Sequence, residues 1–214
     1  NFPGWLYHHG FSSMPVANGA WGMGCIGYPG HPVWEVTGAC NLRCIHCHAT
    51  SGQASCDELT TDEGKRLIDE LADQSEFRTL IYTGGEPLVR PDIFELLKHS
   101  QKAGLANIIA TNGTLIDEEM AFRLKDHGVV CNAISFDAAQ ASVHDFVRNK
   151  PGSFDLAMRA IEATKKAGIL LQINTTAMEY NMPYLPELID FADSTGAGIM
   201  LMYQLVAVGR GEKI

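Results

Sequence analysis

Three cysteines within eight residues constrain this chain more than any other feature of its sequence. Cys40, Cys44 and Cys47 form a C-x3-C-x2-C pattern directly after the β-rich run 33–37. Thiolates this close in sequence converge on one metal centre, and soft sulfur ligands favour zinc, copper(I) or an iron–sulfur cluster over harder ions. A cubane cluster has four irons, so three cysteines leave one iron free to bind a substrate or cosubstrate. The pattern therefore indicates a chemically active site.

A Gly-Gly-Glu-Pro motif at 84–87 follows the strand-like run 80–83. Together with the cysteines, this motif resembles the radical S-adenosylmethionine (radical SAM) superfamily. The resemblance covers roughly residues 33–209. It implies that the three cysteines hold a [4Fe-4S] cluster whose fourth iron chelates the amine and carboxylate of SAM. It also implies that the reduced cluster cleaves SAM to a 5′-deoxyadenosyl radical.

Two alternatives to this interpretation come from the same loop. His46 or His48 could complete a Cys3His zinc site, although paired zinc ligands usually come from two separated knuckles. An electron-transfer cluster with a fourth ligand from elsewhere is the second alternative. Both would make the chain a non-catalytic iron–sulfur or zinc-binding module, and Glu86 on its glycine turn favours the enzyme instead.

Composition limits the class of protein. At 214 residues and 46% hydrophobic residues, the chain can bury a sizeable core and fits one domain. The formal net charge of -9 opposes nucleic-acid binding, which uses basic patches to neutralise phosphate. The tRNA-modifying branches of the family are therefore disfavoured.

The remaining cysteines and the apolar runs indicate the cellular compartment of the protein. Cys25, Cys56 and Cys131 are scattered, which is typical of a reducing cytoplasm and not of a disulfide framework. No apolar run approaches the roughly 20 residues of a membrane helix, and the first residues lack the pattern of a signal peptide. We therefore expect a cytoplasmic protein that binds neither membranes nor nucleic acid.

Residues 1–32 are predicted to form an irregular arm rich in glycine and aromatic residues. The segment 1–38 has eight glycines and all three tryptophans but no Lys or Arg. Its aromatics favour packing across the main domain. The alternative is that His8, His9 or Cys25 contributes to a substrate site.

Residues 33–214 are predicted to form the core domain, in which β-like runs alternate with amphipathic helical runs. This alternation is typical of βα units around a parallel sheet. The predicted strands lie near 33–37, 79–83, 106–111, 130–136, 169–176 and 198–205. One predicted helix follows a capping box at 60–63, and a second has Pro91 in its first turn. Three more are predicted at 116–127, at 154–167 with Ser153 as N-cap, and at 184–194.

A complete eight-unit barrel takes about 250 residues. We therefore predict an α/β fold, a partial (β/α)6 TIM-type barrel open on one side, as in many radical SAM cores. The core is expected to lack its last helix and any C-terminal auxiliary-cluster extension, and the start at Asn1 suggests a fragment.

Strand alternation predicts which side chains face the barrel interior. The two inward sets are Cys131, Ala133, Ser135 and Asp137 in the fourth strand and Leu170, Gln172, Asn174 and Thr176 in the fifth. Active sites of such barrels lie at the carboxyl ends of the strands. Asn112, which ends the third strand, and Asn174 are therefore candidate ribose or substrate contacts.

The family resemblance also implies a set of SAM contacts. The turn formed by Gly84, Gly85, Glu86 and Pro87 would bind the amino group of the methionine portion of SAM. The paired glycines let backbone groups approach a ligand closely, and the Glu86 carboxylate is expected to contact the amine.

Ser135 and Asp137 resemble the SAM-contacting strand of the family, and Arg148 resembles the arginine that meets the SAM carboxylate in several members. A guanidinium suits a carboxylate geometrically. The alternative for Arg148 is a surface salt bridge with Asp145.

Further strings resemble the SPASM-associated branch, which includes haem-synthesis enzymes and cofactor- and peptide-maturation enzymes. These strings are HD-x-x-R with P-G-S-F, Q-I-N-T-T, and L-V-A-V-G-R-G. That branch carries auxiliary-cluster cysteines in a C-terminal extension, whereas no cysteine follows Cys131 here. The resemblance implies hydrogen abstraction from a peptide or a tetrapyrrole-like small molecule, with flavodoxin or ferredoxin as reductant.

Overall fold

The structure is a computed structural model that describes residues 31–74 and 77–214. The predictions made for residues 1–30 lie outside these ranges. They include most of the aromatic arm and the alternative roles of His8, His9 and Cys25.

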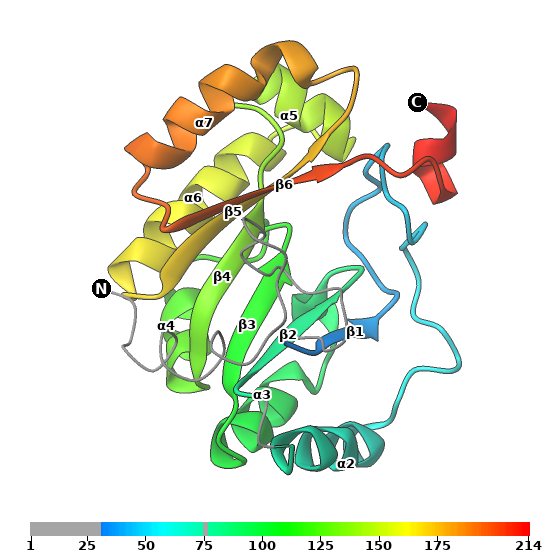
Figure 1. Cartoon of the computed structure of the whole chain (residues 1–214), viewed down its shortest axis with the longest axis vertical. Helices are drawn as coiled ribbons and strands as arrows, with labels where there is room; N and C mark the ends of the chain where they lie inside the picture. Colours follow the sequence, from blue (N-terminus) through cyan, green and yellow to red (C-terminus); the bar gives the residue numbers. More distant parts are fainter. Residues whose placement is uncertain (1–30, 75–76) are drawn as a thin grey trace, which may run out of the picture.

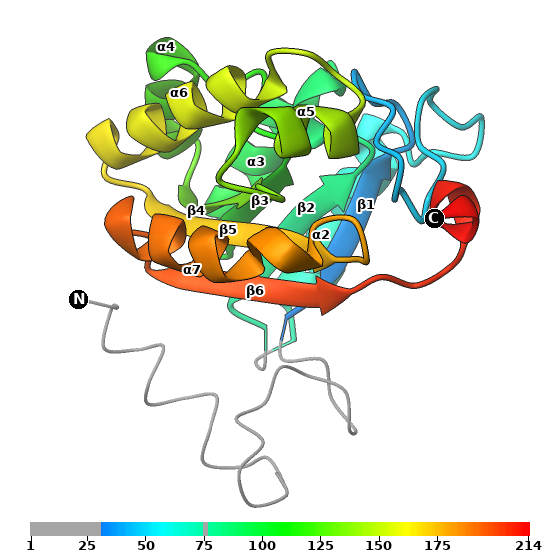
Figure 2. The same cartoon turned by 90° about the horizontal axis from the view of Figure 1, so that it is seen from above.

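Six strands form one parallel sheet whose spatial order follows the chain order (Figure 1). The strands are β1 (Val33–Thr37), β2 (Thr79–Gly84), β3 (Ala106–Thr111), β4 (Val129–Ser135), β5 (Leu170–Ala177) and β6 (Ile199–Gln204). Strands β1 and β6 are the two edges, so the curved sheet is open between them (Figure 2). This arrangement confirms the predicted partial (β/α)6 barrel.

Helices connect the strands and lie along the outside of the curved sheet (Figures 1 and 2). They are α2 (Thr61–Ala72), α3 (Ile93–Lys102), α4 (Glu118–Asp126), α5 (Ala141–Arg148), α6 (Ser153–Lys166) and α7 (Leu185–Ser194). Three 3-10 helices, η1 (Pro87–Val89), η2 (Met182–Tyr184) and η3 (Gly209–Lys213), complete the described elements. Helix α5 was not predicted from the sequence.

The ends of the helices are set by local hydrogen bonds. Thr60 and Glu63 form the predicted capping box of α2, in which each side chain accepts the backbone N–H of the other. Helix α3 begins after Asp92, so the prediction that Pro91 lies in its first turn is wrong.

Helix α6 has a different cap from the one predicted. Its N-cap is Gly152, and Ser153 is the first helical residue. The carboxylate of Asp145 accepts from the backbone N–H groups of Gly152 and Phe154 and from the Ser153 hydroxyl, at 2.6 to 2.8 Å. Asp145 is therefore committed to this cap, and its predicted alternative role as the ion-pair partner of Arg148 is wrong.

Burial alternates between the two faces of the sheet in β5, as strand alternation predicts, but it does not alternate along β4. On the outer face of β4, Ile134 is fully buried beneath the helices, and Asn132 donates to Thr164 of α6. On the inner face, Ser135 and Asn174 stay half-buried. Adjacent in the β4–β5 register, these two residues give the interior a polar, accessible layer.

Because all six strands are parallel, their carboxyl ends meet at one edge of the sheet. The loop after β1, the turn after β2 and the chain after β3 and β4 all leave from this edge (Figure 1). Within residues 31–74 and 77–214, no helix has the length and apolar character needed to cross a bilayer.

Candidate active site

The cysteine loop, residues 38–52, leaves the carboxyl end of β1 and carries the three clustered thiols. Cys44 is buried, Cys40 and Cys47 are half-buried, and all three thiols are free. The backbone N–H of Leu42 donates to Cys40 Sγ at 3.4 Å, a contact that stabilises a thiolate. Burial raises the pKa of the Cys40 thiol.

The glycine pair after β2 fixes the base of this loop. The backbone N–H of Gly85 donates to Thr37 O at 2.7 Å, and that of Glu86 donates to Ala39 O at 2.8 Å. A Cβ on Gly84, which has a φ of +124°, would lie 2.3 Å from Thr37 O. The missing side chains thus let the turn pack against the start of the cysteine loop itself.

Glu86 is fully buried, and protein donors already occupy its carboxylate. The Thr111 hydroxyl lies 2.9 and 3.0 Å from the two oxygens, and the N–H groups of Leu88 and Asn112 donate at 3.1 and 2.8 Å. Burial raises the pKa of Glu86 to about 7 despite these donors. Glu86 therefore joins the ends of β2 and β3, and Pro87 beside it begins η1.

Asn112 links the end of β3 to the cysteine loop. Its amide Nδ2 donates to Asn41 Oδ1 at 2.8 Å, and its own Oδ1 accepts from the N–H and hydroxyl of Thr114. Asn41 in turn donates to the Thr114 hydroxyl at 2.8 Å. The side chain predicted to contact a ribose or substrate thus has protein partners on both of its polar atoms.

Among the predicted SAM contacts, Ser135 and Asn174 keep partly accessible side chains. They are partners in the β4–β5 register and lie on the inner face near the carboxyl ends of their strands. Asn174 Oδ1 accepts from Gln172 on the same face at 2.7 Å, which leaves the Asn174 amide N–H groups facing the interior. This pair presents hydrogen-bonding groups to the barrel interior.

Arg148 joins Asp137 to the cysteine loop. Its Nε lies 2.8 Å from Asp137 Oδ2, and its Nη1 donates to Cys44 Sγ at 3.8 Å. Both charged residues are buried. Burial opposes ionisation of Asp137, yet the Arg148 guanidinium beside it holds the pKa of that carboxyl below its ordinary value. The alternative of a surface salt bridge for Arg148 is therefore wrong, because the pair is internal.

A cluster and a single metal ion require different donor arrangements. A structural zinc site needs four donors that converge within about 2.0–2.3 Å of one ion. Among the described residues, no group of three or more His, Cys, Asp and Glu side chains is arranged to hold one ion. In a cubane each cysteine binds a different iron, so the three thiols need not reach the same ion. Three free thiols on one loop suit the donor set of such a cluster.

Two loop anchors were missed by the sequence analysis. Glu58 Oε1 accepts from the Thr37 hydroxyl and from the N–H groups of Gly38 and Ser55, at 2.8 to 3.0 Å. Arg210, in η3, donates to carbonyl oxygens of the cysteine loop. No local motif marks Glu58. Arg210 lies in the L-V-A-V-G-R-G string, which the sequence analysis used only as a family resemblance.

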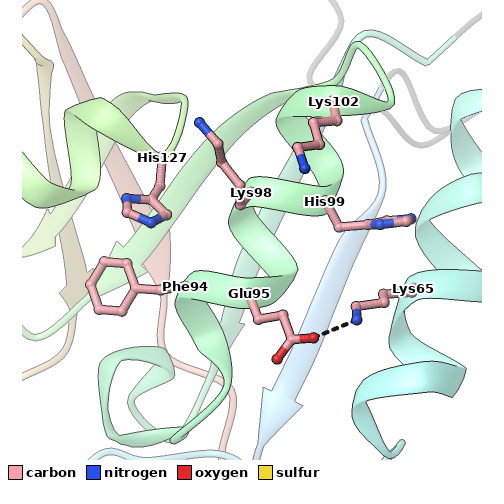
Figure 3. A pocket seen from close by; sticks show the side chains of 7 residues that line it. All are labelled: Lys65, Phe94, Glu95, Lys98, His99, Lys102 and His127. Atoms are coloured by element: carbon pink, nitrogen blue, oxygen red, sulfur yellow. Dashed lines mark hydrogen bonds and ion pairs between the residues drawn. The ribbon is translucent and has the colours of Figure 1, made fainter.

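A pocket of about 380 Å³ lies elsewhere, on the outer side of the helices (Figure 3). Its lining residues are Lys65, Phe94, Glu95, Lys98, His99, Lys102 and His127. They come from α2, α3 and the end of α4, and an ion pair between Lys65 and Glu95 crosses it (Figure 3). None of them is a predicted site residue, so this pocket is separate from the cysteine loop.

The family model of the radical SAM superfamily matches residues 34–192. The chain belongs to the radical SAM superfamily, as the cysteine and glycine motifs predicted. The match covers strands β1 to β5 and the helices from α2 to within α7, and it ends before β6.

Curated relatives support the branch indicated by the sequence. The AdoMet-dependent heme synthase of Methanosarcina barkeri is 41% identical, and the alignment covers 84% of this chain and 52% of that protein. The mycofactocin maturase MftC of Mycolicibacterium smegmatis is 38% identical, with 85% of this chain and 46% of that protein covered. The chain thus spans about half the length of the curated relatives it matches.

Solved structures share the fold at low sequence identity. Streptococcus suis SuiB bound to precursor peptide SuiA gives a TM-score of 0.72 at 17% identity, covering 84% of this chain and 40% of SuiB. Native anSMEcpe with bound AdoMet gives 0.68 at 20% identity, covering 82% and 51%. These likenesses confirm the partial barrel.

Proposed function

We propose that this chain is the catalytic core of a radical SAM enzyme, with Cys40, Cys44 and Cys47 as ligands of a [4Fe-4S] cluster. The observation that carries the proposal is the cysteine loop itself. Its three free thiols stand at the carboxyl-end edge of a family-matched barrel, and hydrogen-bond donors reach two of the sulfurs. When bound and reduced, such a cluster supplies the electron that cleaves SAM to methionine and a 5′-deoxyadenosyl radical.

The proposed SAM site lies between the cysteine loop and the inner face of β4 and β5. Ser135 and Asn174 would contact the ligand directly, because their side chains are accessible on that face. The backbone of Gly84 and Gly85 would accept the methionine amine at the turn that packs against the loop.

Other residues of the predicted site would act by positioning. Glu86 and Asn112 tie the ends of β2 and β3 to each other and to the cysteine loop. Asp137 holds Arg148 against Cys44, and Arg148 could offer its remaining N–H groups to the SAM carboxylate. Pro87 fixes the path of the chain after the turn.

The proposed reaction is hydrogen abstraction from a peptide or a tetrapyrrole-like biosynthetic intermediate. This substrate class is supported by the relatives named heme synthase and mycofactocin maturase and by the neighbour bound to a precursor peptide. The cluster would receive its electron from a small redox protein such as flavodoxin or ferredoxin.

Anaerobic reconstitution with iron and sulfide tests the proposal. The chain is expected to bind about four irons and four sulfides, and the reduced protein is expected to change its EPR signal when SAM is added. A non-catalytic cluster module would assemble the cluster without responding to SAM. A zinc module would bind one ion and show no iron–sulfur absorbance.

A further inference from the structure

The short helix η3 packs against the cysteine loop from the far end of the described chain (Figures 1 and 2). Arg210 makes three contacts with the loop. Its backbone N–H donates to Cys47 O at 3.0 Å, its Nε donates to Cys44 O at 2.7 Å, and its Nη1 donates to Ser51 O at 3.0 Å. One residue therefore holds carbonyl groups from the middle and the end of the loop.

Gly209 lets η3 come this close. It has a φ of +59°, and a Cβ built on it would lie 2.3 Å from His48 O and 2.7 Å from Cys47 O. Real Cβ atoms do not approach backbone oxygens so closely, so any larger residue would push η3 away from the loop. The contact is therefore a close packing of two backbone segments, which requires a residue without a side chain at position 209.

The peptide unit between Cys44 and Ile45 is held on both sides. Its carbonyl accepts from Arg210 of η3, and its N–H donates to Val147 O of α5 at 3.0 Å. The next residue of α5, Arg148, contacts the Cys44 sulfur. The backbone orientation of the buried central cysteine therefore depends on two elements distant from it in sequence.

We propose that residues 209–211 act as a clamp that holds the cysteine loop in its cluster-binding geometry, with Arg210 as the positioning residue. The inference rests on the proposed function in so far as the loop holds a cluster. A guanidinium bridges two carbonyls with donors at fixed angles, which a flexible ammonium cannot reproduce. Release of the clamp frees the Cys44 carbonyl and leaves Ser51 O with Arg43 as its remaining donor. The loop can then open, so the bound cluster becomes accessible to chelators.

The rate of cluster loss tests the clamp. The full chain and its variants are reconstituted anaerobically, and the iron–sulfur absorbance is followed in excess chelator. Arg210→Ala and Gly209→Ala are each expected to lose the cluster roughly tenfold faster than the wild type, the size of effect expected for one lost charge-assisted hydrogen bond. Arg210→Lys is expected to lose the cluster at a rate between those of the wild type and Arg210→Ala.

Matched controls separate the clamp from general effects. Gly196 also has a positive φ, +75°, but a Cβ there would meet nothing within 4 Å, so Gly196→Ala adds the strain without the clash. Lys213→Ala removes an exposed positive charge from the same turn and leaves the Arg210 contacts in place. Both controls are expected to lose the cluster at the wild-type rate.

A second measurement separates positioning from stability. The urea midpoint of the metal-free chain is expected to stay the same in Arg210→Ala, because the clamp acts on a loop. In Gly209→Ala it is expected to fall no further than in Gly196→Ala, which carries the same backbone strain. A wild-type rate of cluster loss in either variant would overturn the proposal, as would a fall in the urea midpoint that parallels the faster loss. A wild-type chain that assembles no cluster would overturn the proposed function and the clamp together.

Discussion

Arg148 and Cys44 lie 104 residues apart in the chain, and the arginine Nη1 lies 3.8 Å from the cysteine Sγ. Helix α5 brings them together, and Asp137 orients the guanidinium through its contact with Nε. A buried positive group beside a sulfur ligand favours the more negative, reduced form of a cluster, and hydrogen bonds to sulfur are one of the ways in which proteins set cluster potentials.

Replacing Arg148 is therefore predicted to make the cluster harder to reduce. Arg148→Lys keeps a cation for Asp137 but shortens the side chain that reaches Cys44 Sγ. We expect the midpoint potential of the SAM-free cluster to fall by about 50 mV, which corresponds to roughly a tenfold change in a one-electron equilibrium. Arg159→Lys is the control, because Arg159 lies on α6 and donates to Thr114 O and not to a cysteine sulfur. Equal potentials in wild type and Arg148→Lys would contradict the assignment.

Each of Cys40, Cys44 and Cys47 is predicted to be required for cluster assembly. Single Cys→Ala variants should lose the iron–sulfur absorbance, because the removed thiolate leaves a second iron without a protein ligand. Cys56→Ala is the matched control, as Cys56 is an exposed free thiol outside the loop. Iron and sulfide contents near the wild-type values in all three loop variants would refute the ligand assignment.

Ser135→Leu is predicted to block SAM binding and leave the cluster intact. The larger apolar side chain would fill the accessible inner face beside Asn174. Val130→Leu on the same strand is the control, because Val130 is already 44% exposed and lies on the opposite face. The measurement is the change in the EPR signal of the reduced cluster during SAM titration. A wild-type titration curve for Ser135→Leu would show that the ligand lies elsewhere.

Glu86 is predicted to make the stability of the metal-free chain depend on pH. Its folded pKa of about 7 lies above the ordinary value of 4.5 for a glutamate, so the folded state binds more protons than the unfolded state between these values. The free energy of unfolding should therefore fall by about 3 kcal/mol at most as pH rises through this window. Glu86→Gln cannot titrate and should remove this component of the slope. Urea unfolding across the window measures it, and identical slopes in the two proteins would contradict the prediction.

The order of strands could be predicted because local signals agree with the fold. The helices α3, α4 and α6 are followed by Gly104, Gly128 and Gly168, whose φ angles are +90°, +79° and +65°. Glycine is favoured in this conformation, so it marks the helix ends in the sequence. Alternation of apolar residues then fixes the strands between them to within one or two residues.

Helix α5 was missed because it is short and begins without a strong signal. It has eight residues, and its N-cap Gln140 makes no side-chain capping bond. Val143 and Val147 share its buried face, and Asn149 ends it with a φ of +51°. An asparagine in a left-handed cap is a recognisable helix terminator, so Asn149 was the available signal.

The roles of the site side chains depend on long-range contacts that no local pattern encodes. The sequence marked Glu86 as a ligand contact but did not reveal that Thr111 and the N–H of Asn112 donate to its carboxylate. Similarly, the contact between Arg210 and Cys44 spans 166 residues. Motifs can identify which residues gather at the carboxyl edge of the sheet. Which of them face a ligand is decided by packing.

Formation of 5′-deoxyadenosine tests the central claim most directly. The reconstituted chain is incubated anaerobically with SAM and a strong reductant, and the products are separated and quantified by chromatography. The account predicts that wild type releases 5′-deoxyadenosine and methionine, whereas Cys44→Ala releases neither. A wild-type protein that carries a full, reducible cluster and leaves SAM intact would contradict the proposal that this chain is a radical SAM catalytic core.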